Sequence, residues 1–267
     1  MSSSNWPASA WPARRPLVLR IYMLAVRAVF VRDMLHFWRE RSRVFGFVAS
    51  PLLFWLLLGA GFGDMGKFFC GSLLLSVMFT AVFSCMSVIE DRREGFLLSV
   101  LSAPAPRCAL VSGKVLAGSV MSGIQGVLFL PLLIITGRPM TAIDVLSAAG
   151  TLVLCGAAFT SLGFWMAWKS RTPQGFHAMM NLILMPLWLV SGALFDTSTA
   201  QRWIRVVMDL NPLSYFLAAL QRTIPADPSW AGPQLGEGLL WTSICGILFL
   251  TAAVMNVERR PLGKDGL

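Results

Sequence analysis

The residues that could perform chemistry are few and widely separated in this sequence. The two histidines, His36 and His177, are too few and too far apart to suggest a metal site. Ser191 lies about four helical turns beyond His177, so the two cannot form a nucleophile and base on one helix. No glycine-rich phosphate loop of the form G-x-x-x-x-G-K-[ST] occurs. We therefore expect no enzyme activity, no catalytic residue, no bound metal and no cofactor in this chain.

The composition indicates the class of protein to which such a chain belongs. Of its 267 residues, 56% are hydrophobic and only 13% are charged, whereas soluble domains carry about 25% charged residues. The mean hydropathy of +0.68 also indicates a polytopic membrane protein. The net charge of +9 is better explained by orientation in the bilayer and by anionic headgroups than by nucleic acid. The five scattered cysteines predict no disulfide framework.

Apolar runs divide the chain into membrane-spanning helices, so the expected fold class is all-α. Each run is long enough to cross a bilayer, which needs about 20 residues. The six expected transmembrane helices cover residues 44–62, 68–89, 115–137, 145–168, 176–195 and 238–257. Drawn this way, the spans contain no Asp, Glu, Lys or Arg, which argues against an ion bound within the chain as the energy source. They form one domain, 44–258, between a disordered tail at 1–16 and a short tail at 259–267.

An amphipathic helix is expected before the first span, over residues 17–43. Apolar residues recur along one face, and a basic face carries Arg32, His36, Arg39 and Arg43. This pattern suits an interfacial helix that lies in the plane of the lipid headgroups. The alternative is a first membrane span over residues 17–31. That run is short and contains Arg20 and Arg27, so the interfacial helix is favoured.

The basic residues also orient the predicted bundle. An even number of spans places both termini on the same side. That side receives most of the 22 Lys and Arg residues, and the other side receives Lys67, Arg138, Arg202, Arg205 and Arg222. The positive-inside rule then makes both termini cytosolic in a multi-pass protein of the cell membrane.

The long excursion over residues 196–237, on the outer side, has helical character of its own. Trp203, Val206, Val207 and Leu210 fall on one helical face, and Asn211-Pro212 interrupts the pattern. The next apolar run is too short to cross the bilayer. We expect two short re-entrant helices that dip into the outer leaflet. The alternative is a folded surface loop.

The densest charge cluster between the first and last spans lies at residues 90–94, on the cytosolic side. An apolar, helix-like run follows at residues 96–101, and Pro104 and Pro106 end it. Such an amphipathic helix could lie on the membrane or dock in a partner's groove. The alternative is an ordinary cytosolic loop held by headgroup contacts.

At this point the sequence resembles a known family. The order Glu90-Asp-Arg-Arg-Glu-Gly95, Leu98-x-x-Leu101-x-Ala-Pro104 and Gly113-Lys114 is similar to the cytosolic loop of ATP-binding-cassette type-2 exporter permeases. Residues 181–195 resemble the fifth span of these permeases. Trp203, Asn211-Pro212-Leu213-Ser214-Tyr215 and Arg222 resemble the outer excursion that follows that span. The resemblance covers most of the chain, from about residue 20 to about residue 255.

The resemblance implies a transmembrane permease subunit of an exporter that works as a homodimer in a bacterial inner membrane. A separate cytosolic ATPase subunit would supply the energy, through a coupling helix that carries Glu90, Arg92, Arg93, Glu94, Gly95, Leu98 and Leu101. Trp203, Asn211, Pro212 and Tyr215 would belong to the outer gate. Substrates of the family include polysaccharides, nodulation factors, drugs and lipids.

Two other functions remain open on the sequence alone. A membrane scaffold or assembly subunit without a transport path would show the same six spans. A membrane-embedded enzyme is disfavoured because no constellation of residues supports it. Co-purification of a cytosolic ATPase would distinguish an exporter subunit from a scaffold, and turnover by the lone subunit would be needed for an enzyme.

Overall fold

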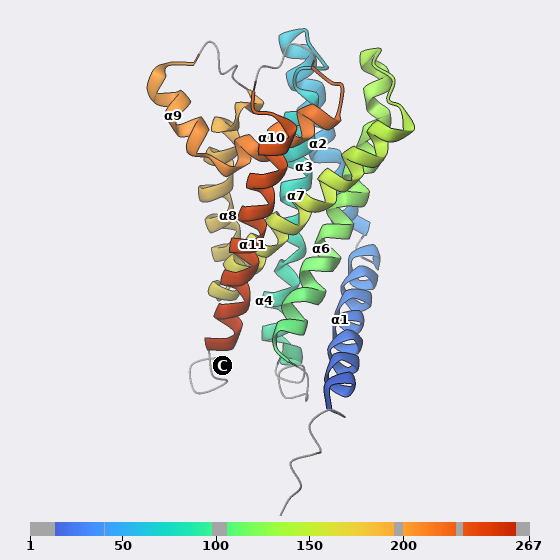
Figure 1. The fold of residues 1–267 in the computed structure, drawn as a ribbon, viewed down its shortest axis with the longest axis vertical. Helices are drawn as coiled ribbons and strands as arrows, with labels where there is room; N and C mark the ends of the chain where they lie inside the picture. Colours follow the sequence, from blue (N-terminus) through green and yellow to red (C-terminus); the bar gives the residue numbers. More distant parts are fainter. Residues whose placement is uncertain (1–13, 40, 98–105, 195–199, 228–231, 260–267) are drawn as a thin grey trace, which may run out of the picture.

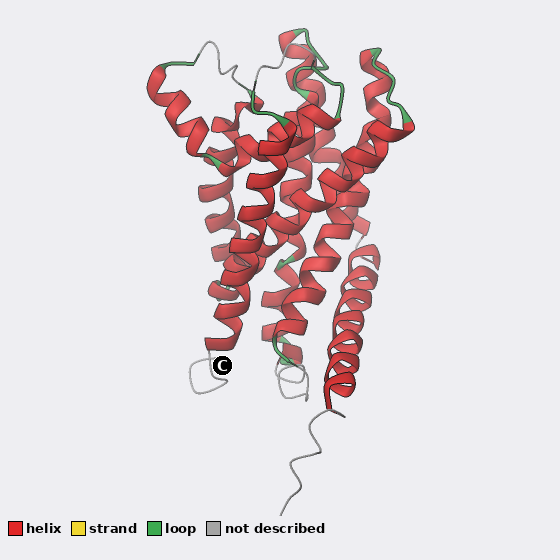
Figure 2. Cartoon of the chain, viewed as in Figure 1, coloured by secondary structure: helices red, strands yellow, loops and turns green. Residues whose placement is uncertain are grey.

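The computed structural model describes residues 14–39, 41–97, 106–194, 200–227 and 232–259. Every regular element in this part of the chain is a helix (Figures 1 and 2). The elongated bundle confirms the all-α class. Both the N-terminal helix and the C-terminal helix have their outer ends at the same end of the bundle, the lower end in Figure 1. We call this the terminal end, and the other the distal end.

Five helical segments of the described residues are long and apolar enough to cross a membrane. They confirm that the protein is a polytopic membrane protein. The segments are Phe69–Arg93, Cys108–Ile135, Ala142–Lys169, Pro173–Ala193 and Leu235–Arg259. The first consists of α3 (Phe69–Ser84) and α4 (Met86–Arg93), and the second joins α6 (Cys108–Phe129) to the 3-10 helix η2 (Leu130–Thr136). The others correspond to α7 (Ala142–Lys169), to α8 (Pro173–Trp188) with the π-helical η3 (Leu189–Ala193), and to α11 (Leu235–Arg259).

The predicted span at residues 44–62 falls within α2 (Arg41–Phe62). Its described part contains a shorter apolar helix, Pro51–Phe62. Trp55 is fully buried in this segment, and its indole nitrogen donates a hydrogen bond to the Met65 carbonyl. The ring of Trp55 also packs edge-on against Phe69 and Phe129. These contacts fix the distal end of α2 against α3 and α6.

The helix expected at 17–43 is present as α1 (Arg14–Arg39), but it does not lie across the bundle. Tyr22 contacts Ser112 of α6, and Met34, Phe37 and Trp38 line a crevice with Met121, Ile124 and Leu128. The contacts advance along both helices together, so α1 runs parallel to α6 (Figure 1). A helix in the headgroup plane would cross α6 at one level only. The physical reason for the difference is that Asp33 and Arg32 find charged partners beside α6, as described below.

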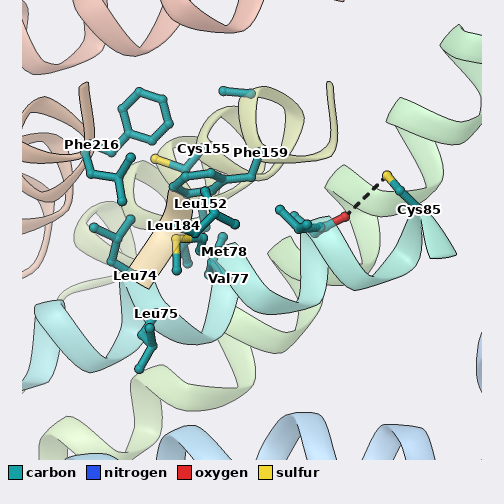
Figure 3. Packing of buried hydrophobic residues seen from close by; sticks show 14 of the residues in the cluster. Leu74, Leu75, Val77, Met78, Cys85, Leu152, Cys155, Phe159, Leu184 and Phe216 are labelled. Carbon is teal, nitrogen blue, oxygen red and sulfur yellow. Dashed lines mark hydrogen bonds between the residues drawn. The ribbon is translucent and has the colours of Figure 1, made fainter. Parts of the chain in front are cut away.

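The core forms around α3, whose side chains are buried along nearly its whole length. Figure 3 shows Leu74 and Met78 of α3 packed among Leu152 and Phe159 of α7, with Leu184 of α8 beside them. Phe216 of α10 (Pro212–Thr223) lies next to Phe159, with ring centres 4.9 Å apart. Helix α3 therefore lies in the interior of the bundle, packed against α2, α6, α7 and α10.

Small residues let the helices of this core approach closely. A Cβ atom on Gly118 of α6 would lie 2.5 Å from the Ser84 side-chain oxygen and 2.5 Å from the Thr160 methyl carbon. A Cβ atom on Gly163 of α7 would lie 2.9 Å from the Val82 Cα atom. Close backbone approach at small residues is a usual way to pack helices in membranes.

Local sequence explains where α7 and α8 begin. Thr141 and Asp144 form a capping box at the start of α7, in which the Thr141 hydroxyl accepts from the Asp144 amide and the Asp144 carboxylate accepts from the Thr141 amide. Thr172 caps α8 by accepting from the Gly175 amide at 3.1 Å. Pro173 follows at the first helical position, where its missing N–H costs nothing.

Candidate coupling site

The charged stretch at 90–94 is a helix end rather than a loop. α4 runs to Arg93, and Gly95 then adopts a φ of 75°. This left-handed conformation favours glycine, and it turns the chain back at the terminal end of the bundle. Glu94 and Gly95 close the turn by donating their amides to the carbonyls of Glu90 and Arg92. The predicted coupling residues Glu90, Arg92, Arg93, Glu94 and Gly95 therefore lie on one helix end and its turn.

The exposed part of this turn is small. Arg93 and Glu94 are exposed, whereas Leu97 is buried just beyond the turn. The predicted residues Leu98 and Leu101 lie outside the described residues. The solvent-facing surface of the described turn is therefore charged.

Asp91 points into the protein and joins α4 to α1. Its two carboxylate oxygens accept from both terminal nitrogens of Arg32, with the Nη1 contact at 2.9 Å. The Arg32 guanidinium carbon also lies 3.8 Å from the ring centre of Phe96, just past the turn. A planar guanidinium can pair with a carboxylate in a bidentate way and stack on a ring at the same time. Arg32 thus contacts both sides of the Gly95 turn.

Lys114 of α6 lies at the centre of the same cluster and is only 2% exposed. Its ammonium donates to Asp91 at 3.0 Å, to the Ser87 hydroxyl at 2.7 Å and to Asp33 at 3.0 Å. The ammonium has three protons, so all of its donors have acceptors. Four charged side chains from α1, α4 and α6 thus form one network, which we call the ionic cluster: Arg32, Asp33, Asp91 and Lys114.

The ionic cluster is balanced in charge, with two cations and two carboxylates. Burial raises the pKa of the Asp33 carboxyl above its ordinary value, and the neighbouring Lys114 ammonium opposes this rise. An unpaired charge at this depth would be costly, whereas pairing and hydrogen bonds satisfy all four groups. The cluster therefore requires α1, α4 and α6 to be present together.

Arg92 ties the same helix end to α7. Its guanidinium donates to the carbonyls of Ser170 and Trp168, both at 3.0 Å, and lies 5.2 Å from the Trp168 ring centre. These carbonyls belong to the last turn of α7, where helix carbonyls lack partners within the helix and cations are favourable. On α4, Asp91 thus holds α1 and α6, and the adjacent residue Arg92 holds α7.

The residues of the predicted basic face of α1 have different environments in the structure. His36 and Arg39 are exposed, as a surface stripe would require. Arg32 differs, because its side chain is turned toward Asp91 and Phe96 and is 33% exposed. Arg43 lies in the first turn of α2, among the residues whose side chains the structure does not describe.

The four predicted residues of the outer gate gather around α9 (Arg202–Leu210) and α10 at the distal end (Figure 1). Asn211 caps α10 by accepting from the Leu213 amide, and its side-chain amide donates to the Leu187 carbonyl at 2.6 Å. Pro212 is the first residue of α10, and the Tyr215 hydroxyl donates to the Asp209 carbonyl. Trp203 is 66% exposed on α9, where its indole nitrogen donates to the Gln201 side-chain oxygen.

Sequence reasoning missed Asp33, Asp91, Ser87 and Lys114 as members of the site. The span was drawn from residue 115, but α6 begins at Cys108, so Lys114 lies within an apolar helix. The signal was a lysine flanked by Gly113 and Val115, in a chain that otherwise keeps charges out of its spans. The partner could not be found in this way, because Asp33 is 81 residues distant.

Within the described residues, no group of three or more His, Cys, Asp or Glu side chains could hold a metal ion. What the structure does contain is a bundle of membrane-length helices whose terminal ends are joined at one charged corner.

Comparison with known proteins gives the family. The model of the ABC-2 type transporter family matches residues 25–224, which is most of the chain. The chain therefore belongs to the ABC-2 type transporter family. It is a non-catalytic transmembrane permease subunit of the kind that pairs with an ATPase subunit.

Individual relatives are distant but cover much of the sequence. A protein named as a transport permease, ycf38, from Pyropia yezoensis is 24% identical over 239 residues, which cover 82% of this chain and 80% of the relative. The linearmycin resistance permease protein LnrN of Bacillus subtilis is 27% identical over 73% of this chain and 49% of its own length. YbhR of Escherichia coli, named as a probable multidrug ABC transporter permease, is 21% identical over 67% of this chain and 47% of its own length. The matches span about half the length of LnrN and YbhR.

Proposed function

We propose that this permease exports an amphipathic substrate outward, using ATP that a separate cytosolic subunit hydrolyses. The substrate class is a lipid, a lipid-linked or other polysaccharide, or a drug. Two relatives support the amphipathic or drug-like end of this range, because their names are those of a linearmycin resistance permease and a multidrug transporter permease.

The observation that carries the proposal is the position of the Gly95 turn. The end of α4 carries exposed charges outward at Arg93 and Glu94 and is held inward by Asp91 and Arg92. A partner that pushed on Glu94 would therefore move α1, α6 and α7 together. A surface turn without inward contacts could not transmit such a movement.

The membrane arrangement follows from the same proposal. α2 serves as a sixth span beside the five long segments, so that both ends of the chain lie in the cytosol of a bacterium. The exposed residues Arg20 and Arg27 near the start of α1 face the inner headgroups, which revises the flat interfacial helix. α9 and α10 dip into the outer leaflet, and two copies of the chain form the transport unit.

Co-purification tests the ATPase contact. Glu94→Lys should weaken binding of the cognate ATPase subunit, because it reverses an exposed charge on the Gly95 turn. Asp209→Lys reverses an exposed charge on α9 at the distal end and serves as the matched control. Binding is measured as ATPase recovered per permease after affinity purification from membranes. If the wild-type chain recovers no ATPase, or if both variants recover it equally, the proposed contact is wrong.

A further inference from the structure

The ionic cluster has a feature that the proposed contact does not explain. The proposed ATPase surface lies on Arg93 and Glu94, yet the neighbouring Asp91 is 2% exposed and faces the opposite way, toward α1 and α6. A buried network that only stabilised the protein could be replaced by apolar residues, since buried ion pairs are often no better than well-packed hydrophobic side chains. What a buried ionic network adds is specificity: it determines which charged side chains pair, and so how α1, α4 and α6 are placed beside one another.

We propose that Lys114 is a positioning residue for transport, which holds α1 against the Gly95 turn so that α1 follows α4 during the ATP-driven movement. The inference deepens the proposed function and rests on it. Lys114 reaches Asp33 of α1 on one side and Ser87 and Asp91 of α4 on the other. Lys114, which belongs to α6, therefore joins α1 to α4.

The other contacts of α1 differ in kind from this one. Val29 packs on Gly113, and Tyr22 donates to the Ser112 hydroxyl at 2.8 Å. Both contacts join α1 to α6 but do not reach α4. Only the ionic cluster, among the contacts described here, brings α1 side chains to α4, with Asp33 acting through Lys114 and Arg32 acting directly. Removal of Lys114 and its Asp33 partner should therefore weaken the coupling of α1 to α4, with the Arg32–Asp91 pair as the remaining direct link, while the helices remain packed.

The test uses the double variant Asp33→Asn/Lys114→Met in the complex with the ATPase. One anion and one cation are removed together, so the Arg32–Asp91 pair remains and the cluster stays neutral. The readout is the nucleotide-dependent change in distance between spin labels at Leu35→Cys in α1 and Val206→Cys in α9, both exposed positions. Because this measurement needs no substrate, it is independent of the unknown cargo.

We expect the double variant to bind the ATPase and to hydrolyse ATP as the wild type does, but with a smaller distance change. The equilibrium between the two conformations should respond to nucleotide roughly tenfold less, within the usual range of coupling between sites. A distance change equal to that of the wild type would overturn the inference. Failure of the wild-type complex to show any change would instead overturn the proposed function.

A second variant covers the case in which the double variant fails to fold. Asp33→Glu keeps the charge pair and lengthens the side chain by one methylene. If Lys114 sets the position of α1, the distance change should shrink while the unfolding temperature stays close to that of the wild type. If Asp33→Glu behaves as the wild type in both respects and the double variant is unfolded, the role of the cluster is structural and the inference fails.

Discussion

The guanidinium of Arg32 stacks on the ring of Phe96 at 3.8 Å while both its terminal nitrogens bind Asp91. These two partners lie on opposite sides of Gly95, whose left-handed φ of 75° turns the chain between them. A side chain from α1 thereby spans the turn on which the ATPase contact is proposed. The turn is consequently shaped from within the permease, before any partner binds.

Replacement of Arg32 by lysine should show how much this geometry matters. Lysine keeps the charge but cannot pair with both Asp91 oxygens and stack on Phe96 at once. The guanidinium is partly exposed, so we expect Arg32→Lys to lower the free energy of unfolding by only about 1 kcal/mol. Thermal unfolding of the purified permease in detergent measures the effect. Arg39→Lys, at an exposed position on the same helix, should be neutral, and an equal loss in both variants would contradict the prediction.

Arg92→Lys should loosen the joint between α4 and the end of α7. The variant leaves at least one of the Trp168 and Ser170 carbonyls without its present donor. We expect ATP hydrolysis in the complex to continue while export falls, because the ATPase-facing turn remains but its attachment to α7 is weaker. Export and hydrolysis are measured side by side in proteoliposomes. The exposed Arg39→Lys of α1 is the control, and it should leave the ratio of export to hydrolysis unchanged.

Two glycine-to-alanine substitutions should have different effects on the stability of the permease. Gly118→Ala places a Cβ atom 2.5 Å from the Ser84 and Thr160 side chains, and overpacking of this kind costs about 1–3 kcal/mol. Gly150→Ala has nothing within 4 Å, so the helical preference of alanine should leave stability unchanged or raise it by up to about 1 kcal/mol. The folded yield and the unfolding temperature in detergent distinguish them. Equal behaviour would show that α3, α6 and α7 are not packed as described.

Asn211 should tolerate neither aspartate nor alanine, for different reasons. Asn211→Asp keeps the acceptor that caps α10 but replaces the donor to the Leu187 carbonyl by a second oxygen. Asn211→Ala loses both bonds and should cost about 1–2 kcal/mol, as removal of an N-cap does. We expect the aspartate variant to be at least as unstable as the alanine variant, since a buried carboxylate would face a carbonyl. A more stable aspartate variant would show that capping alone matters here.

The membrane helices could be predicted from the sequence because apolar runs of bilayer length leave a strong signal. α7 and α11 extend only a few residues beyond the runs drawn at 145–168 and 238–257. The direction of α1 could not be predicted in the same way. Its basic and apolar faces suit a headgroup-plane helix, but Asp33 pairs with a lysine in a distant part of the sequence, and this ion pair aligns α1 with α6.

The residues at 90–94 include both exposed and buried side chains, and the sequence alone could not tell them apart for a similar reason. The charge pattern predicted a contact surface at 90–94; Arg93 and Glu94 are exposed there, and the contact itself stays a prediction. The same cluster also contains Asp91, which is buried, and nothing in the local pattern distinguishes it from its neighbours. The α-helical period turns Asp91 inward and Glu94 outward only once the packing of α4 is known.

The 81 residues between Asp33 and Lys114 also have a consequence for biosynthesis. The ribosome makes α1 first, and Asp33 must wait until α6 has entered the bilayer before its partner arrives. Until then the carboxylate has to remain hydrated at the membrane surface, since an unpaired charge cannot be buried without a large cost. Completion of the ionic cluster can therefore occur only after α6 has been made, so α1 cannot dock fully on the bundle before that point in synthesis.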